Sequence, residues 1–290
     1  GTWTNSSSLT IGDSGSGNGL VISNGGMVTV GTNLVISALA GASNNSVSIS
    51  DGSLTVTNGQ IDIGKAGSGT LEVTGGTVTV KELLATNGTN SVITFNGGTI
   101  ISEGTTVDNG SALYIGDTGS GATFIANGGT HDFTSAMVVG FRGSSNSLVI
   151  SNGGIVANSL GYIGSLSSSN NSVLVTGTDS VWTNSGILSV GGSGSGNSLT
   201  ISNGSTVANT EGNIGTFSSS SNNSVLVTDG GTWTNSGILY VGRGGSSDSL
   251  VISNGGTVVN TEGYIGFTNT ASNNSVLVTD GGTWTNSSSL

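Results

Sequence analysis

The chain has 290 residues, of which 53 are Gly and none is Pro or Cys, and only 7% of its residues are charged. Its formal net charge is -11, and Lys65, Lys81, Arg142 and Arg243 are its only fixed cations. This composition excludes disulfides and thiolate-bound metal, and it makes nucleic acid and anionic membrane poor partners.

The predicted elements are short strands that repeat from the first residues onward. "GTWTNSSSLTIG" at 1–12 holds two apolar runs and "LVISNGG" at 20–26 begins with a third, each bounded by Gly, Asn or Ser. Further along, "SNNSVLVTDGGTWTNSGILYVG" at 221–242 returns as "SNNSVLVTDGGTWTNS" at 272–287. Trp182, Trp233 and Trp284 are 51 residues apart, and each such block divides into two related halves. The repeating unit is therefore about 25 residues with three strands.

One strand in most units ends in the pattern apolar-x-apolar-Gly. This marker closes at Gly12, Gly64, Gly116, Gly140, Gly191 and Gly242, and three further copies begin with Gly at Gly161, Gly212 and Gly263. Ala, Glu and Lys are too scarce for helices, and "VKELLAT" at 80–86 is the one segment of ambiguous type. We therefore predict an all-β fold, a right-handed parallel β-helix (β-solenoid) of about 11 turns of about 25 residues.

Alignment of the units predicts which side chains face the core. The second residue after each Gly-Gly turn is apolar in all but one unit: Trp3, Val28, Leu54, Val78, Ile100, His131, Val156, Trp182, Val207, Trp233, Val258 and Trp284. We expect this column to point inward, with Trp3, Trp182, Trp233 and Trp284 as a structural core stack. The central residue of the marker strand is mixed, so that column should point outward: Thr10, Asp62, Tyr114, Val138, Tyr162, Ser189, Asn213, Tyr240 and Tyr264.

The corner before each Gly-Gly turn carries a polar residue. Asn or Asp occupies it at Asn24, Asp51, Asn96, Asn127, Asn152, Asn203, Asp229, Asn254 and Asp280. Such residues tolerate the positive φ of a tight corner, and we expect their stacked side chains to hydrogen-bond along the axis.

The nine residues "GTWTNSSSL" occur both at 1–9 and at 282–290, with Trp3 and Trp284 281 residues apart. We expect 1–290 to be a single uncapped solenoid, one 281-residue period of a longer array with 11 turns in that interval. Residues 98–150 are its least regular turns, because the longest unit lies between Gly98 and Gly129.

At "GGTWTNSGILYVG" and "SLVISNGGTV" the sequence resembles the autotransporter-associated β-strand repeats of very large bacterial surface proteins. The likeness covers nearly the whole chain and is clearest over 140–290. It implies an exported β-helical passenger, extracellular or displayed on the bacterial surface.

No set of residues predicts chemistry, so we expect no enzyme, no cofactor and no metal site. His131 is the only His and is expected to reach solvent through a local distortion. The acidic pairs Glu103 with Asp108 and Asp117 with Asp132 are sparse for sugar cleavage. A calcium ladder is ruled out, because the residue after the marker Gly is Asp13 in one turn but Lys65 or Arg243 in others.

Two functions remain, with a polysaccharide-acting enzyme as a third and weaker alternative. The first is a structural rod or filament whose partner is the same chain, end to end. The second is an adhesin that binds surface glycans or neighbouring cells through outward Tyr114, Tyr162, Tyr240 and Tyr264 or through the loops of 98–150. Neither function involves nucleic acid or membrane insertion by this segment.

Overall fold

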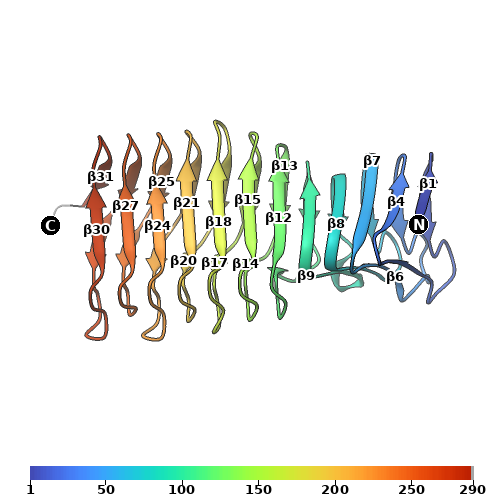
Figure 1. Cartoon of the computed structure of the whole chain (residues 1–290), viewed down its shortest axis with the longest axis horizontal. Helices are drawn as coiled ribbons and strands as arrows, with labels where there is room; N and C mark the ends of the chain where they lie inside the picture. The colour runs from blue at the N-terminus through green and yellow to red at the C-terminus, as the bar shows by residue number, and fades with distance from the viewer. Residues whose placement is uncertain (289–290) are drawn as a thin grey trace.

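The computed structural model describes residues 1–288 and has the shape of one rod, with the two ends of the chain at opposite ends of the rod (Figure 1). It consists of parallel strands in stacked coils, about 11 turns of about 25 residues each. The one helical element among the described residues is the short 3-10 helix η1 (Gly88–Asn90). The parallel β-solenoid predicted from the repeats is thus confirmed, and residues 80–85 of the ambiguous segment are extended, at the end of β8 (Gly69–Ala85).

Three strands per turn give the rod three faces, which we number in the order in which the chain visits them. The first face stacks β1 (Thr2–Asn5), β4 (Gly26–Val30), the start of β7 (Gly52–Ile63), the middle of β8, the end of β9 (Ser91–Ser102), β12 (Ala122–Asn127), β15 (Ser147–Ser151), β18 (Ser172–Thr176), β21 (Ser198–Ser202), β24 (Ser224–Val227), β27 (Ser249–Ile252) and β30 (Ser275–Val278). The second face stacks β2 (Leu9–Ile11), β5 (Leu34–Ile36), the ends of β7 and β8, β10 (Thr105–Val107), β13 (Thr130–Phe133), β16 (Ile155–Asn158), β19 (Val181–Asn184), β22 (Thr206–Asn209), β25 (Thr232–Asn235), β28 (Thr257–Asn260) and β31 (Thr283–Asn286).

The third face stacks β3 (Gly19–Ile22), β6 (Asn45–Ile49), the starts of β8 and β9, and then a separate sheet of seven short strands. These seven are β11 (Leu113–Ile115), β14 (Met137–Val139), β17 (Gly161–Ile163), β20 (Leu188–Val190), β23 (Gly212–Ile214), β26 (Ile238–Val241) and β29 (Glu262–Ile265). The backbone amide of Gly116, just after β11, donates to the carbonyl of Phe95 in the first half of β9 at 2.8 Å. This hydrogen bond links the seven-stranded sheet to the earlier strands of the third face.

Alternation along each strand builds the core. In β18 the inward Val173 and Val175 are buried, and the three residues that alternate with them are half-buried. Each strand pairs in register with the strand one turn away, so inward side chains lie over other inward apolar side chains. Leu148, Val173 and Leu199 are stacked in this way in three successive turns. The result is one continuous apolar core along the rod.

The expected single inward column is divided between two faces. Trp3, Val28, Leu54, Val78 and Ile100 do stack in this order, but the next residue on Ile100 is Phe124, not His131. His131 pairs with Thr105 on the second face, and the column that continues from it holds Trp182, Trp233 and Trp284. The prediction that Trp3 shares a stack with the other three tryptophans is therefore wrong.

The cause lies in the long unit between Gly98 and Gly129. It accommodates four strands (the end of β9, β10, β11 and β12) where every other unit accommodates three. The extra strand turns the repeat by one face, so "TWTN" lies on the first face at 2–5 and on the second face at 283–286. The 281 residues from Trp3 to Trp284 therefore contain eleven turns and one additional face, not 11 whole turns.

The same shift divides the expected outward column. Thr10 and Asp62 belong to the second face, on either side of Val35, whereas Tyr114 and the marker residues after it belong to the third face. Asp62 is buried, and this burial raises the pKa of its carboxyl above the ordinary value.

The two-turn period of the C-terminal half comes from the tryptophans. Trp182 and Trp233 are fully buried, and each indole Nε1 donates to an Asn one turn below, Asn158 or Asn209, at 2.7 Å. The marker strand of that lower turn begins with Gly: a Cβ on Gly212 would lie 2.8 Å from Cζ2 of Trp233. A Cβ at this position would crowd the ring, and the position alternates between Gly below each tryptophan (Gly161, Gly212, Gly263) and a large apolar residue below each Val (Met137, Leu188, Leu239).

At the N-terminal end Trp3 has no turn below it and is 46% exposed, although it faces inward. In the last described turn Trp284 is partly buried against the core, while Leu277 and Val278 are about half exposed. The four tryptophans thus include two fully buried rings and two terminal ones.

Candidate functional site

The third face gathers the four tyrosines that the sequence singled out. Its seven-stranded sheet aligns Tyr114, Val138, Tyr162, Ser189, Asn213, Tyr240 and Tyr264 in one outward column, one residue per turn. We call this the tyrosine column. Tyr240 is buried against Tyr264, Phe267 and Arg243, whereas Tyr264, in the last strand of this sheet, is 37% exposed.

Aromatic rings pack along this column where tyrosines are adjacent. The rings of Tyr240 and Tyr264 are stacked, with centroids 5.4 Å apart and an interplanar angle of 16°, and Phe267 contacts both edge-on. The guanidinium of Arg243 lies 5.1 Å from the Tyr240 centroid. Tyr264 donates its hydroxyl to Glu262 at 2.8 Å, and this bond raises the pKa of Tyr264.

The column is interrupted where Ser189 and Asn213 replace tyrosine. Over these two turns lies a groove of about 430 Å³, which we call the third-face groove. Its floor contains Ser189 and Asn213, and Tyr162 lines it at the turn below Ser189. This volume is in the range of small-molecule sites.

A second outward column, formed by the loops, makes the other wall. The backbone amide of Ser193 donates to the Ser165 carbonyl at 2.7 Å, and that of Phe217 donates to the Gly192 carbonyl at 3.1 Å. These hydrogen bonds align Leu166, Ser193 and Phe217 in successive turns. Leu166 and Phe217 project beside the groove and are exposed, whereas Ser193 between them is small. The tyrosine column and the loop column therefore both have a small residue, Ser189 and Ser193, in the same turn. The groove opens at this turn because neither side chain fills the space.

The polar groups of the groove are anchored by one ion pair. Arg243 Nη1 lies 3.0 Å from Glu211 Oε1, and the same carboxylate oxygen accepts from Asn213 Nδ2 at 2.9 Å. Ser189 and Thr216 share a hydroxyl–hydroxyl hydrogen bond of 2.6 Å. Asn213 is only 1% exposed, and its Oδ1 has no hydrogen-bond partner among the described residues.

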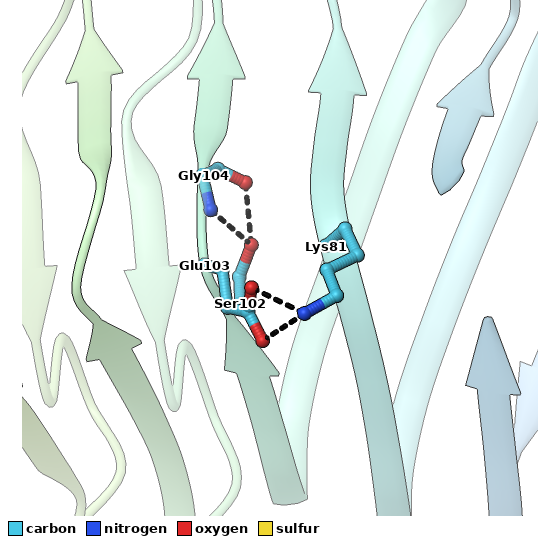
Figure 2. A network of polar contacts seen from close by, with 4 residues as sticks. All are labelled: Lys81, Ser102, Glu103 and Gly104. Atoms are coloured by element: carbon cyan, nitrogen blue, oxygen red, sulfur yellow. Dashed lines mark hydrogen bonds and ion pairs between the residues drawn. The ribbon is translucent and has the colours of Figure 1, made fainter. Parts of the chain in front are cut away.

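The acidic residues of 98–150 do not form a catalytic pair. Figure 2 shows Lys81 donating to both carboxylate oxygens of Glu103, at 2.6 Å each, beside the bonds between Ser102 and Gly104. Arg142 Nη1 lies 3.8 Å from Asp117 Oδ1, and the hydroxyl of Thr134 donates to Asp108 Oδ1 at 3.0 Å. Within residues 1–288 no group of three or more His, Asp or Glu side chains converges on a metal position.

His131 does not reach solvent, contrary to our expectation. Its ring is fully buried, with Nδ1 3.0 Å from Thr105 Oγ1 and Nε2 2.8 Å from the Gly128 carbonyl oxygen. Phe124 packs edge-on against it at 6.1 Å between centroids. Burial lowers the pKa of this imidazole. It is a hydrogen-bonded core residue at the turn where the repeat changes face.

Sequence reasoning missed a ladder of side chains that runs inside another corner. The residue immediately before each first-face strand from β15 onward accepts from the backbone amide one turn below, over Asn146, Asn171, Asn197, Asn223, Asp248 and Asn274. The middle four, Asn171, Asn197, Asn223 and Asp248, accept from the side-chain amide of that turn as well. The marker Gly makes room for it: a Cβ on Gly164 would lie 2.2 Å from Asn197 Nδ2. The signal in the sequence was the second Asn of "SNNSV", at Asn171 and Asn223.

The corner before the Gly-Gly turn behaves differently. Asn152 donates to Asn127 at 2.6 Å, but Asn203 and Asn254 donate to the hydroxyls of Thr176 and Thr228. The expected ladder is therefore not continuous there. The positive φ expected for this corner occurs at Asn24, Asn152, Asn203, Asp229, Asn254 and Asp280, but not at Asp51, Asn96 or Asn127.

Asp248 is the one carboxyl in the buried ladder. It is fully buried, its Oδ1 accepts two bonds from Asn223 at 2.9 and 3.0 Å, and its Oδ2 has no hydrogen-bond partner among the described residues. Burial raises the pKa of this carboxyl above 3.8, and the bonds from Asn223 lower it by less.

Replacing Asp248 by Asn is expected to stabilise the chain at neutral pH by about 1–3 kcal/mol, because an amide can donate where the carboxylate Oδ2 cannot. Between pH 3.8 and its raised pKa, the folded carboxyl binds more protons than the unfolded one. The stability of the unsubstituted chain should therefore fall as the pH rises through this interval, and the variant should lack that fall. Thermal unfolding of both proteins between about pH 3 and about pH 8 measures the difference.

Asp229→Asn is the matched control, since Asp229 is an exposed corner carboxyl that alternates with Asn in other turns. The fall in stability assigned to Asp248 should persist in this variant, because Asp248 is retained. Parallel stability curves for the unsubstituted chain and Asp248→Asn would contradict the role given to Asp248.

The fold and these surfaces define the chain as a parallel β-solenoid with one interrupted aromatic column on its third face. None of the protein-family models, curated proteins or solved structures compared with this chain matches it. In residues 1–288 no helix is long and apolar enough to cross a membrane.

Proposed function

We propose that this chain is a structural element, a stiff rod or filament on or outside a bacterial cell. The observation that carries the proposal is the continuous parallel ladder of strands, which spans the described chain with one apolar core and a buried side-chain ladder beside it. Each turn is bonded to its neighbours along the rod axis, so bending must distort many backbone hydrogen bonds at once.

The proposed partner is another copy of the same chain, end to end. The terminal strands β30 and β31 carry unpaired edges in the described chain, and inward Val278 is 45% exposed there. β1 and β2 lie on the same two faces at the other end, so copies stacked with their faces aligned would extend both ladders. In a covalent array of 281-residue periods, each period would instead be turned by one face.

Negative-stain microscopy of the purified chain tests this proposal. We expect rods of about 50–55 Å, at about 4.8 Å per turn, and longer particles in steps of that length as the protein concentration rises. Val278→Lys should suppress the longer particles, because stacking would bury an unpaired charge. Leu277→Lys, which adds the same charge to an outward position, should not. Particles that stay at unit length at all concentrations would contradict end-to-end assembly.

A second candidate function is adhesion through the third face. The observation that favours it is the third-face groove, which lies where Ser189 and Asn213 occupy two adjacent turns of the tyrosine column. The loops of 98–150 were expected as the place that differs from the rest, but the groove lies in the regular half of the rod.

A further inference from the structure

We propose that the third-face groove binds a neutral saccharide, lying over Ser189 and Asn213 at the gap between Tyr162 and Tyr240. This inference deepens the second candidate function and rests on it. It is independent of whether the rod assembles end to end.

The groove is a gap of defined size that the fold cannot close. Backbone pairing fixes successive turns about 4.8 Å apart, so Tyr162 and Tyr240, three turns apart, are separated by about 14 Å along the axis. Where tyrosines occupy adjacent turns their rings stack, as Tyr240 and Tyr264 do. Ser189 and Asn213 are too small to fill the interval, which leaves room for a six-membered ring from outside the chain.

The lining has the two kinds of surface that a sugar ring presents. Tyr162, Leu166 and Phe217 offer apolar contact area, and Phe217 is 60% exposed. The C–H face of a pyranose can pack on such side chains. Its hydroxyls can both donate and accept, which suits the mixed hydroxyl, amide and guanidinium groups of Ser189, Asn213 and Arg243.

One buried acceptor in the groove lacks its partner. Asn213 Oδ1 has no hydrogen bond from any described residue, while the Nδ2 of the same amide is bonded to Glu211. An unpaired buried acceptor costs about 1–3 kcal/mol, and a small rotation of the amide toward a ligand hydroxyl would recover part of that cost.

Charge and polarity distinguish this ligand class from two others. An anion such as phosphate would gain little from Arg243, because Glu211 already pairs with it at 3.0 Å. A purely aromatic ring would fill the gap but would leave the buried Oδ1 of Asn213 without a hydrogen-bond donor. A neutral polyhydroxylated ring meets both requirements.

Isothermal titration of the full chain with maltotriose, cellotriose, mannotriose and xylotriose tests the proposal, with inorganic phosphate and a tyrosine-containing tripeptide as competing probes. We expect one-to-one binding of at least one trisaccharide, with a dissociation constant of about 1 mM or below. Ser189→Tyr should weaken it at least about tenfold, because it restores the tyrosine column and fills the gap. Phe217→Ala, at an exposed position that does not threaten folding, should weaken it about threefold or more.

Tyr264→Ser is the matched control, since Tyr264 lies outside the groove on the same column, and it should leave the affinity unchanged. The groove assignment is overturned if no trisaccharide binds, if only phosphate or the peptide binds, or if binding survives both Ser189→Tyr and Phe217→Ala. If binding survives these two variants but is lost in Tyr264→Ser, the third face still binds the sugar, but the groove is not the binding site. Unit-length rods that still bind sugar would refute filament assembly alone.

Discussion

Trp233→Ala is expected to lower the free energy of unfolding by about 3–5 kcal/mol, the largest single loss in the chain together with the equivalent Trp182→Ala. The indole is fully buried between two turns, and its removal leaves a cavity over Gly212, which has no side chain to fill it. The substitution also removes the donor to Asn209 Oδ1. Thermal unfolding followed by circular dichroism measures the loss, and hydrogen exchange should locate it in β22, β25 and β28.

Trp3→Ala provides the control within the same chain. Trp3 faces inward in the same kind of strand but is 46% exposed and has a single neighbouring turn, so its loss should be less than half as large. Equal losses at Trp3 and Trp233 would show that burial between turns is not what the tryptophans contribute.

Asn197→Leu is expected to be nearly as destabilising, although it replaces a polar side chain by an apolar one of similar shape in a buried position. Asn197 Oδ1 accepts from both the backbone amide and the Nδ2 of Asn171 at 3.0 Å, and its own Nδ2 donates to Asn223. Two buried donors of Asn171 would be left unpaired, at about 1–3 kcal/mol each. Chemical denaturation of the variant measures the sum.

Asn58→Leu is the corresponding control, since Asn58 is exposed and makes one long bond of 3.3 Å to the Gly31 carbonyl. Its effect should stay within about 0.5 kcal/mol. If Asn197→Leu were equally neutral, the buried ladder would hold the loops in place without contributing to stability.

Both predictions concern contacts between turns, and the sequence anticipated them unequally. Inward placement of Trp182 and Trp233 followed from their fixed position in a period-2 strand. The role of Gly212 beneath Trp233 was visible only as an unexplained Gly at the head of a marker strand. The ladder through Asn197 was missed, because Asn, Gly, Ser and Asp vary at the neighbouring positions and the chain is rich in all four.

The candidate site shows the same division. Outward tyrosines at Tyr162 and Tyr240 were predicted from alternation within the marker strand. Their separation by a groove was not, because that depends on Ser189 and on Ser193 of the following loop being small in the same turn. Ser193 carries no mark of its own in a sequence where Ser is common.

By itself, the sequence determined that this protein is a parallel solenoid of three-strand turns, because strand length, the alternation of apolar residues and the Gly corners are all local properties. Only the tertiary structure decided which face each strand joins. The extra strand between Gly98 and Gly129 shifts every later strand by one face without altering any local pattern. Face assignment depends on the summed number of strands along the chain, and the groove and the buried ladder depend on side chains that meet across turns about 25 residues apart.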